Sequence, residues 1–230
     1  MEYTKPVLEL ELYIIRHGES LGNIGYNGRT DLTLTESVDP VLSEKGINQA
    51  IAAGEFLSET DFDAVYSSAL MRAVRTAGEI IKKQPSEKEL FVHPVFTEMG
   101  IPEEYHAVSM DELRKLCPTA TVADGVDPDS KMMEANSGSD EKGLFERGAR
   151  SIEYLCSKYK KGEKVAVVSH AAFITYMVFY IMGYREKVPA FDLDFTNTGI
   201  TKVKFYKEGT NKYGDIVFEY INSTSHLISK

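Results

Sequence analysis

Five side chains of this sequence have types and positions that suggest that they act together in one reaction. Each lies at or shortly after the end of an expected strand, and they are Arg16, His17, Arg72, Glu98 and His170. An imidazole near neutral pH can act as a nucleophile or carry a proton, and a carboxylate can donate or accept one. Guanidinium groups stay charged and bind anions through paired hydrogen bonds. A site built from these groups would hold an anion and transfer a group or a proton.

The expected strands explain why these residues should meet. Residues 8–15 alternate in polarity and then become continuously apolar, which is typical of a strand that becomes buried. Residues 63–67, 90–95 and 164–169 indicate three more strands. Ligands of α/β folds bind beyond the carboxyl ends of the strands. Strand ends usually carry Gly, Asn, Asp or Ser, so two histidines, two arginines and a carboxylate at one edge are informative.

Helical segments alternate with these strands. The expected helices span residues 43–58, 69–83, 109–116, 143–159 and 171–183, and two late strands span 200–206 and 215–220. Ser43 is the expected N-cap of the first helix. Residues 20–41 show no sustained period, which indicates a long loop. The alternation predicts an α/β fold, a three-layer sandwich with a mostly parallel central sheet flanked by helices.

Length and composition indicate a globular protein. The chain has 230 residues, of which 43% are hydrophobic and 27% charged, so we expect a single domain over residues 1–230. Its formal charge of −9 disfavours binding along a nucleic-acid backbone, which needs a basic surface. This charge does not exclude an anionic substrate, because local charges govern a pocket. We expect no nucleic acid and no membrane as partner, and the oligomeric state stays open.

Other features disfavour further classes of protein. Cys117 and Cys156 are too few for a disulfide framework or a zinc quartet. The longest apolar run, residues 171–184, is shorter than the roughly 20 residues that a membrane span needs. The N-terminus lacks a signal-peptide pattern, so the expected location is the cytoplasm. The acidic residues within 123–142 lack the spacing of a calcium loop, and we expect neither a metal nor a cofactor.

Five sequence blocks together resemble a known family. They read RHGES with Asn23, LSEKGINQA, YSSALMRAVRTA, VVSH and NTG, at residues 16–23, 42–50, 66–77, 167–170 and 197–199. Their content and order are similar to those of the histidine phosphatase superfamily, in its phosphoglycerate mutase-like branch. The similarity is lost in residues 24–38, in residues 101–142 and in the C-terminal tail.

The resemblance implies roles for the residues at the expected sheet edge. His17 would attack phosphorus through a neutral ring nitrogen and form a phosphohistidine, which divides the reaction into two steps. Arg16 and Arg72 would hold the phosphoryl oxygens. His170 precedes an apolar helix, and it would complete the phosphate cradle at the N-terminus of that helix.

Two asparagines and a glutamate complete the implied site. The side-chain amides of Asn23 and Asn197 are candidate phosphate ligands. Glu98 would protonate the leaving alkoxide and then deprotonate the attacking water. The residues that follow Glu98 differ from the family pattern, so Glu103 and Glu104 remain alternative proton donors.

The resemblance implies a metal-independent phosphomonoesterase that acts on a small phosphorylated substrate. A phosphoglycerate mutase would use the same cradle, but the family's mutases carry E-R-H-Y-G at the acid, where residues 98–102 read EMGIP. A third alternative is a module that binds phosphorylated ligands without turnover, and the intact set of site residues speaks against it. A divergent insertion at about 97–142 would lie over the active site and, with residues 24–38, select the substrate.

Overall fold

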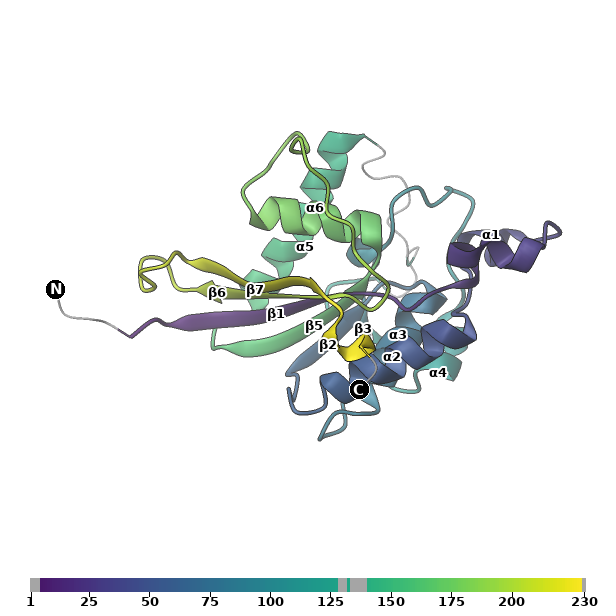
Figure 1. Cartoon of the computed structure of the whole chain (residues 1–230), viewed down its shortest axis with the longest axis horizontal. Coiled ribbons are helices and arrows are strands. Elements are labelled where there is room, and N and C mark those ends of the chain that lie inside the picture. Colours follow the sequence, from purple (N-terminus) through teal and green to yellow (C-terminus); the bar gives the residue numbers. More distant parts are fainter. Residues whose placement is uncertain (1–4, 128–131, 133–139, 229–230) are drawn as a thin grey trace.

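A mixed seven-stranded sheet forms the centre of the fold (Figure 1). The computed structural model describes residues 5–127, 132 and 140–228. The strands are β1 (Leu8–Arg16), β2 (Ala64–Ser67), β3 (Leu90–Val92), β4 (Ala120–Val122), β5 (Glu163–Ser169), β6 (Ile200–Tyr206) and β7 (Ile216–Ser223). Their spatial order is β4-β3-β2-β5-β1-β6-β7.

Parallel pairs make up the larger part of this sheet. The pairs β1–β5, β5–β2, β2–β3 and β3–β4 are parallel, whereas β6 is antiparallel to β1 and β7 is antiparallel to β6. Successive antiparallel strands need only a short turn between them, and parallel neighbours need a longer crossover such as a helix. The mostly parallel sheet expected from the sequence is confirmed, and the β6–β7 hairpin adds an antiparallel edge.

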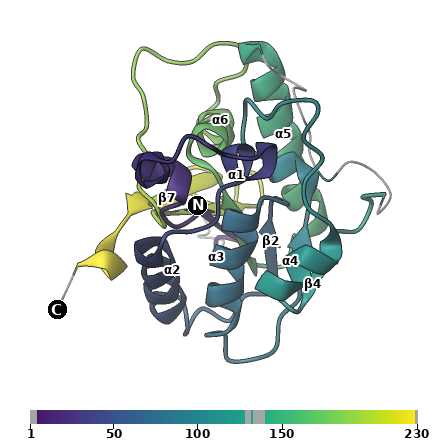
Figure 2. The ribbon, with the colours of Figure 1, turned by 90° about the vertical axis from the view of Figure 1, so that its right-hand side faces the viewer.

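Helices cover both faces of the sheet and give the fold three layers. The helices are α2 (Glu44–Phe56), α3 (Met71–Ile81) and α4 (Met110–Leu116) on one face and α5 (Glu141–Lys158) and α6 (Ala171–Ile181) on the other (Figures 1 and 2). Strand β1 serves both layers, because its side chains alternate. Leu10, Leu12 and Ile14 pack with α5 and α6, whereas Tyr13 and Ile15 pack with α2, α3 and α4. The α/β sandwich predicted from the sequence is confirmed.

Capping side chains set where several helices begin. Ser43 is the N-cap of α2, as predicted, and its hydroxyl accepts a backbone N–H of the first turn. Ser109 caps α4 in the same way, and Asp140 caps α5. The cap at Asp140 explains why α5 begins at Glu141, slightly before the expected start at residue 143. Among the described helices none is both long and apolar enough to cross a membrane.

The expectation of a long loop at residues 20–41 is wrong for most of that segment. It contains the 3-10 segment η1 (Leu21–Gly28), which is interrupted by left-handed backbone at residues 25–27. It also contains the short helix α1 (Leu34–Val38), which begins at a capping box on Thr33. Local capping produces such short helices without a hydrophobic period, so periodicity does not reveal them.

Two edge features also differ from the expectation. Strand β4 was not predicted, because its three residues are too few to show a period. Strand β3 ends before residue 95, because Pro94 begins the 3-10 segment η2 (Pro94–Phe96). A last 3-10 segment, η3 (Ser225–Leu227), follows β7. Of the expected insertion at 97–142, residues 128–131 and 133–139 lie outside the described residues.

Candidate active site

The ends of β1 and β5 bring the two histidines together. These strands are parallel neighbours, and Arg16 lies opposite Ser169 in their register. The N–H of His17 donates to the carbonyl of Ser169 at 3.0 Å, so the pairing continues one residue past the strand. The rings of His17 and His170 consequently lie with centroids 5.0 Å apart.

Close backbone packing holds the turn after His17 in place. A side chain at Gly46 would bring its Cβ within 1.9 Å of the carbonyl oxygen of Glu19, and one at Gly18 would lie 2.4 Å from the carbonyl oxygen of Gly46. The N–H of Glu19 also donates to the side-chain carbonyl of Gln49 at 2.9 Å. The block at residues 42–50 thus supports the loop that carries His17. The first turn of α2 contains Gly46 because any larger residue there would collide with the backbone of this loop.

The hydrogen bonds of His17 define its tautomer. Its Nδ1 lies 2.7 Å from the carbonyl oxygen of Gly18, and a carbonyl can only accept, so Nδ1 carries the proton. Nε2 then has a free lone pair, which accepts a hydrogen bond from Nε of Arg72 at 3.2 Å. Burial lowers the pKa of His17 well below its usual value, and the charges of Arg72 and Arg16 lower it further. The imidazole is therefore neutral, and a neutral ring with an unprotonated Nε2 has the lone pair that a nucleophile needs.

Arg72 is anchored from below by a buried carboxylate. It lies in the first turn of α3, and its Nη1 lies 3.3 Å from Oδ1 of Asp39. Asp39 is fully buried and accepts the N–H of Met71 at 2.9 Å and the phenol O–H of Tyr105 at 3.1 Å. Burial raises the pKa of Asp39 to about 6, while the guanidinium of Arg72 opposes that shift. This support fixes the direction of the guanidinium without blocking it.

Arg16 approaches the same place from the end of β1. Its Nη1 donates to the carbonyl of Phe195 in the loop after α6. Its Nε is buried and has no hydrogen-bond partner within the described part of the chain. Such a buried, unpartnered donor is costly unless a ligand satisfies it. The arrangement suits an anion that accepts hydrogen bonds from Arg16.

His170 lies behind His17 and is fully buried. Its Nε2 lies 2.7 Å from the hydroxyl oxygen of Ser68, which also accepts the N–H of Leu70 at 3.3 Å. The hydroxyl of Ser68 can donate to Nε2 in one tautomer of the neutral ring and accept from it in the other. The Nδ1 of His170 is buried without a hydrogen-bond partner among the described residues. Burial and the charge of Arg72 lower the pKa of His170 well below its usual value.

Glu98 is held at the N-terminus of α6. Its Oε1 accepts the N–H of Phe173 at 3.0 Å and the N–H of Met99 at 2.9 Å. His170 is the N-cap residue of α6 and makes no side-chain cap, so Glu98 supplies the acceptor that the first turn of this helix needs. Glu98 lines the same pocket as His17. Glu103 and Glu104 are exposed and do not line it.

The two asparagines have different surroundings. Asn197 donates through Nδ2 to the carbonyl of His17 at 3.1 Å and to Oδ1 of Asn23 at 3.2 Å, which uses both protons of its amide. Asn23 Oδ1 also accepts the N–H of Ser20 at 3.0 Å. Asn23 lines the pocket, whereas Asn197 lies outside its lining and braces the backbone of His17.

The pocket has a volume of about 230 Å³, and its lining includes Arg16, His17, Asn23, Arg72 and Glu98. The structure therefore gathers five of the seven proposed site residues around one space, and His170 and Asn197 lie outside its lining. No group of three His, Cys, Asp or Glu side chains that could hold a metal occurs among the described residues.

Sequence reasoning missed two supporting side chains. Asp39 lay in a segment interpreted as an irregular loop, where an Asp before Pro40 is an ordinary turn residue. Ser68 lay inside the block at residues 66–77 without a role of its own. A buried position cannot be inferred from either local context. The place of Ser68 directly after the expected strand at residues 63–67 is the sequence signal that points to it, and Asp39 has no such signal.

Comparisons with known proteins agree with this geometry. The model of the histidine phosphatase superfamily (branch 1) matches residues 12–213. The chain belongs to this superfamily. The resemblance expected from the five sequence blocks is confirmed.

The proteins to which this chain is similar include mutases and phosphatases. A 2,3-bisphosphoglycerate-dependent phosphoglycerate mutase of Bartonella henselae is 38% identical over 111 residues, which cover 47% of this chain and 50% of that protein. The fructose-2,6-bisphosphatase TIGAR of Mus musculus is 28% identical over 162 residues, which cover 70% of this chain and 56% of that protein. The chain thus spans about half the length of the curated relatives that it matches.

A solved structure covers nearly the whole chain. The phosphoserine phosphatase of Entamoeba histolytica, in complex with 3-phosphoglyceric acid, has a TM-score of 0.62 and 26% sequence identity. The match covers 95% of this chain and 100% of that one. A phosphoglycerate mutase of Bacillus anthracis, with a TM-score of 0.61 and 20% identity, shares the fold.

Proposed function

We propose that this protein is a metal-independent phosphomonoesterase that works through a phosphohistidine at His17 and acts on a small phosphorylated metabolite. The observation that carries the proposal is the tautomer of His17. Its Nδ1–H is tied to the carbonyl of Gly18, and its Nε2 lone pair lies at a pocket lined by Arg16, Arg72 and Glu98. The phosphatases among its relatives support the same reaction class.

In the first step, the Nε2 lone pair of His17 forms a bond to phosphorus while the bond from phosphorus to the ester oxygen breaks. The carboxylic acid of Glu98 gives its proton to the leaving alkoxide. Arg72 exchanges its hydrogen bond to Nε2 for one to a phosphoryl oxygen. Arg16 and His170 supply further donors, and the arginines stabilise the charge on the transferring group.

In the second step, a water molecule attacks phosphorus and gives its proton to the carboxylate of Glu98. The phosphorus–nitrogen bond breaks, and the electron pair returns to Nε2 of His17. Orthophosphate leaves, and Glu98 is protonated again for the next cycle. Asn23 remains a candidate phosphate ligand in both steps, whereas Asn197 acts as a positioning residue through the carbonyl of His17.

The described part of the segment 97–142 supports the proposal that this divergent region borders the active site. Tyr105 is buried and donates its phenol O–H to Asp39, which in turn holds Arg72. Substitutions in this region would therefore act on phosphate binding through Asp39. We propose that it belongs to a single domain with the rest of the chain.

A phosphoglycerate mutase is the alternative reaction, because mutases are among the relatives. A mutase returns the phosphoryl group to its substrate, so it must hold a substrate carboxylate while the phosphohistidine waits. The residue after Glu98 is Met99, which is exposed, where the family's mutases carry arginine. Hydrolysis is the reaction that this neighbourhood favours.

The test is turnover of p-nitrophenyl phosphate and of small phosphate esters by the wild-type protein and by His17→Ala. We expect hydrolysis by the wild type, a loss of at least about a thousandfold in His17→Ala, and an acid-labile phosphate on the quenched wild type. An acid-stable phosphate, or an active His17→Ala variant, would refute the assignment. Isomerisation of phosphoglycerate faster than its hydrolysis would favour the mutase.

A further inference from the structure

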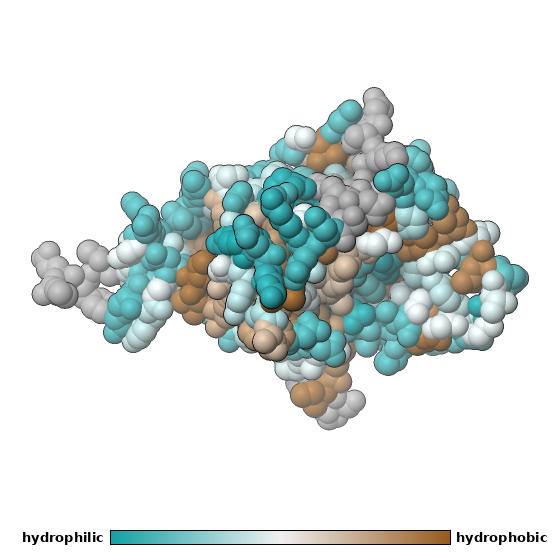
Figure 3. Space-filling model, turned by 90° about the horizontal axis from the view of Figure 1, so that it is seen from above, coloured by the Kyte–Doolittle hydropathy of each residue, from teal (hydrophilic) through white to brown (hydrophobic). Residues whose placement is uncertain are grey.

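A larger hollow lies beside the proposed active site. It has a volume of about 810 Å³ and lies between α6 and residues 188–195 of the loop that follows this helix. We call it the α6 groove. Met99, the residue after Glu98, also lines it. Seen from above, this side of the molecule shows small hydrophobic patches among hydrophilic residues (Figure 3).

Each wall of the α6 groove begins next to a backbone group that is hydrogen-bonded to a residue of the proposed active site. Glu98 accepts the N–H of Phe173 in the first turn of α6, and Ala172 of the same turn lines the groove. On the opposite wall, Phe195 lines the groove and its carbonyl accepts a hydrogen bond from Arg16. The groove therefore starts where the proposed proton donor and one phosphate-binding arginine lie.

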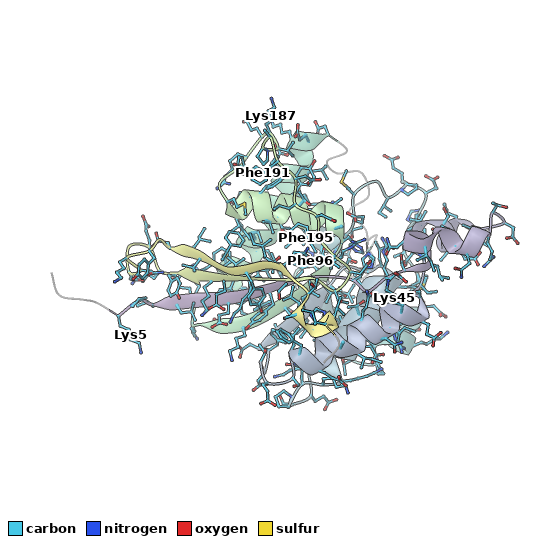
Figure 4. All side chains as sticks on the ribbon, in the orientation of Figure 1. Lys5, Lys45, Phe96, Lys187, Phe191 and Phe195 are labelled. Atoms are coloured by element: carbon cyan, nitrogen blue, oxygen red, sulfur yellow. The ribbon has the colours of Figure 1, made fainter. Side chains whose placement is uncertain are left out.

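The shape of the groove suits an apolar group that extends away from phosphorus. Its near end is lined by the small side chain of Ala172, and its far end by Phe179 and Phe191. The ring of Phe179 has its centroid 5.7 Å from that of Phe191, and Phe191 is 49% exposed. Figure 4 shows Phe191 higher on the loop and Phe195 close to the sheet. An exposed aromatic ring in a hollow offers contact area to an apolar ligand.

The charges of the groove disfavour a second anion. Asp192 and Asp194 are the charged residues among the described residues that line it. The cations nearby in sequence are directed elsewhere: the guanidinium of Arg185 lies 4.0 Å from the ring centroid of Tyr180 and donates to its carbonyl. Lys187 lies at the tip of the loop (Figure 4). A carboxylate or second phosphate in the groove would meet like charge, whereas an amine would be attracted.

We propose that the α6 groove binds the leaving group of the phosphate ester. It selects an apolar leaving group, accepts an amine, and discriminates against a leaving group that carries a carboxylate or another phosphate. The inference rests on the proposed phosphatase function and goes beyond it by naming the substrate class. Glu98 lies at the mouth of the groove. The alcohol that Glu98 protonates would therefore already lie in the groove, and it would leave the protein from there.

The test uses four alkyl phosphates whose leaving oxygens are all alkoxides, so that differences report on the rest of the group. They are 3-phenylpropyl phosphate, 3-aminopropyl phosphate, glycerol 1-phosphate and 3-phosphoglycerate. We expect kcat/KM for the phenylpropyl ester to exceed that for glycerol 1-phosphate by about tenfold. We expect 3-phosphoglycerate to be the slowest of the four.

Two substitutions alter the groove. Phe191→Ala should lower the ratio of kcat/KM for the phenylpropyl ester to that for glycerol 1-phosphate by about tenfold. Asp194→Lys should raise the ratio for 3-phosphoglycerate over the aminopropyl ester by about tenfold, and Asp194→Asn by less. The matched controls are Tyr213→Ala, an exposed aromatic in the β6–β7 turn, and Glu208→Lys in the same turn, which should leave all four rates unchanged.

The outcomes separate the two proposals. If the wild type hydrolyses neither p-nitrophenyl phosphate nor any of the four esters, the phosphatase function fails. If it hydrolyses them but the ratios in Phe191→Ala and in both Asp194 variants equal those in the controls, the groove assignment alone fails. A wild type that prefers 3-phosphoglycerate to the phenylpropyl ester also overturns the groove assignment.

Discussion

The pocket at His17 and the α6 groove lie side by side but are built differently. The pocket takes Arg16 and His17 from the end of β1 and Arg72 from the first turn of α3, and residues between 20 and 40 supply much of the remaining lining. Backbone partners hold its reacting groups: the carbonyl of Gly18 fixes His17, and the N–H of Phe173 fixes Glu98. The groove is lined by one side of α6 and by a loop whose side chains Phe191 and Asp194 are exposed.

The two proposals together assign the chemistry to the pocket and the selection of substrates to the groove. Phosphoryl transfer needs groups positioned to a fraction of an ångström, which the strand ends and their backbone hydrogen bonds provide. Selection of a leaving group needs shape and charge, and an exposed loop can vary both without disturbing the sheet. Substitutions in the pocket should therefore affect every substrate, and substitutions in the groove should change only the order of substrates.

Among the substitutions that test this comparison, the largest effect is expected at Glu98, where the two regions meet. Glu98→Gln keeps an acceptor for the N–H of Phe173 but cannot protonate an alkoxide. We expect kcat/KM to fall by about a thousandfold for alkyl phosphates and far less for p-nitrophenyl phosphate, whose leaving group needs no proton. Rates measured on both ester types check this. Equal losses on both would remove Glu98 from the acid role, and a comparable loss in Glu104→Gln would transfer that role.

The next effect is expected at Arg72. Arg72→Lys keeps a positive charge but loses the planar fork that reaches His17 and Asp39 at once. We expect kcat/KM to fall by about a hundredfold for aryl and alkyl phosphates alike, because the loss concerns the phosphoryl group. Steady-state kinetics on p-nitrophenyl phosphate is sufficient. Arg75→Lys on the same helix, where Arg75 pairs with Glu79, is the control, and a similar loss there would contradict a specific role for Arg72.

A smaller effect is expected below the pocket, at Asp39. Its pKa is raised by burial to about 6 from 3.8, so the folded protein binds a proton more readily than the unfolded chain between these pH values. Its contribution to stability is therefore complete below about pH 4 and is lost as pH rises through about 6. The shift corresponds to about 3 kcal/mol of unfolding free energy.

Denaturant unfolding of the wild type and Asp39→Asn across pH 3.5 to 7 measures this contribution. We expect the wild type to lose stability relative to Asp39→Asn as pH rises through that window, and kcat/KM of the variant at pH 7 to fall only a few-fold, by about 1 kcal/mol. A stability difference that is independent of pH would show that Asp39 is not the titrating group.

The sequence predicted most of the fold and the gathering of the site for a common reason. Arg16, His17 and His170 follow strands with clear apolar runs, and parallel strands end at the same edge of a sheet. The elements that were not predicted show no hydrophobic periodicity in the sequence. The short helices within residues 20–41 depend on local caps, and β4 depends on its neighbour β3 for pairing.

The supporting contacts escaped prediction because they join segments distant in the chain. Asn197 was expected to bind phosphate, but its amide protons are used by the backbone of His17 and by Asn23. Asp39 shows no local sign of burial, yet it is enclosed by α3 and by Tyr105. Neither environment follows from neighbouring residues, since each depends on how loops pack over the sheet.

By itself the amino-acid sequence determined the α/β architecture and the residue types that meet beyond the strands, because periodicity and strand-end position are local properties. Its five motif blocks also indicated the superfamily through their resemblance to it. Only the tertiary structure decided which nitrogen of His17 is unprotonated, which glutamate lines the pocket, and where the α6 groove opens. Hydrogen-bond partners and hollow space arise between segments far apart in the chain, and they exist only once those segments have packed together.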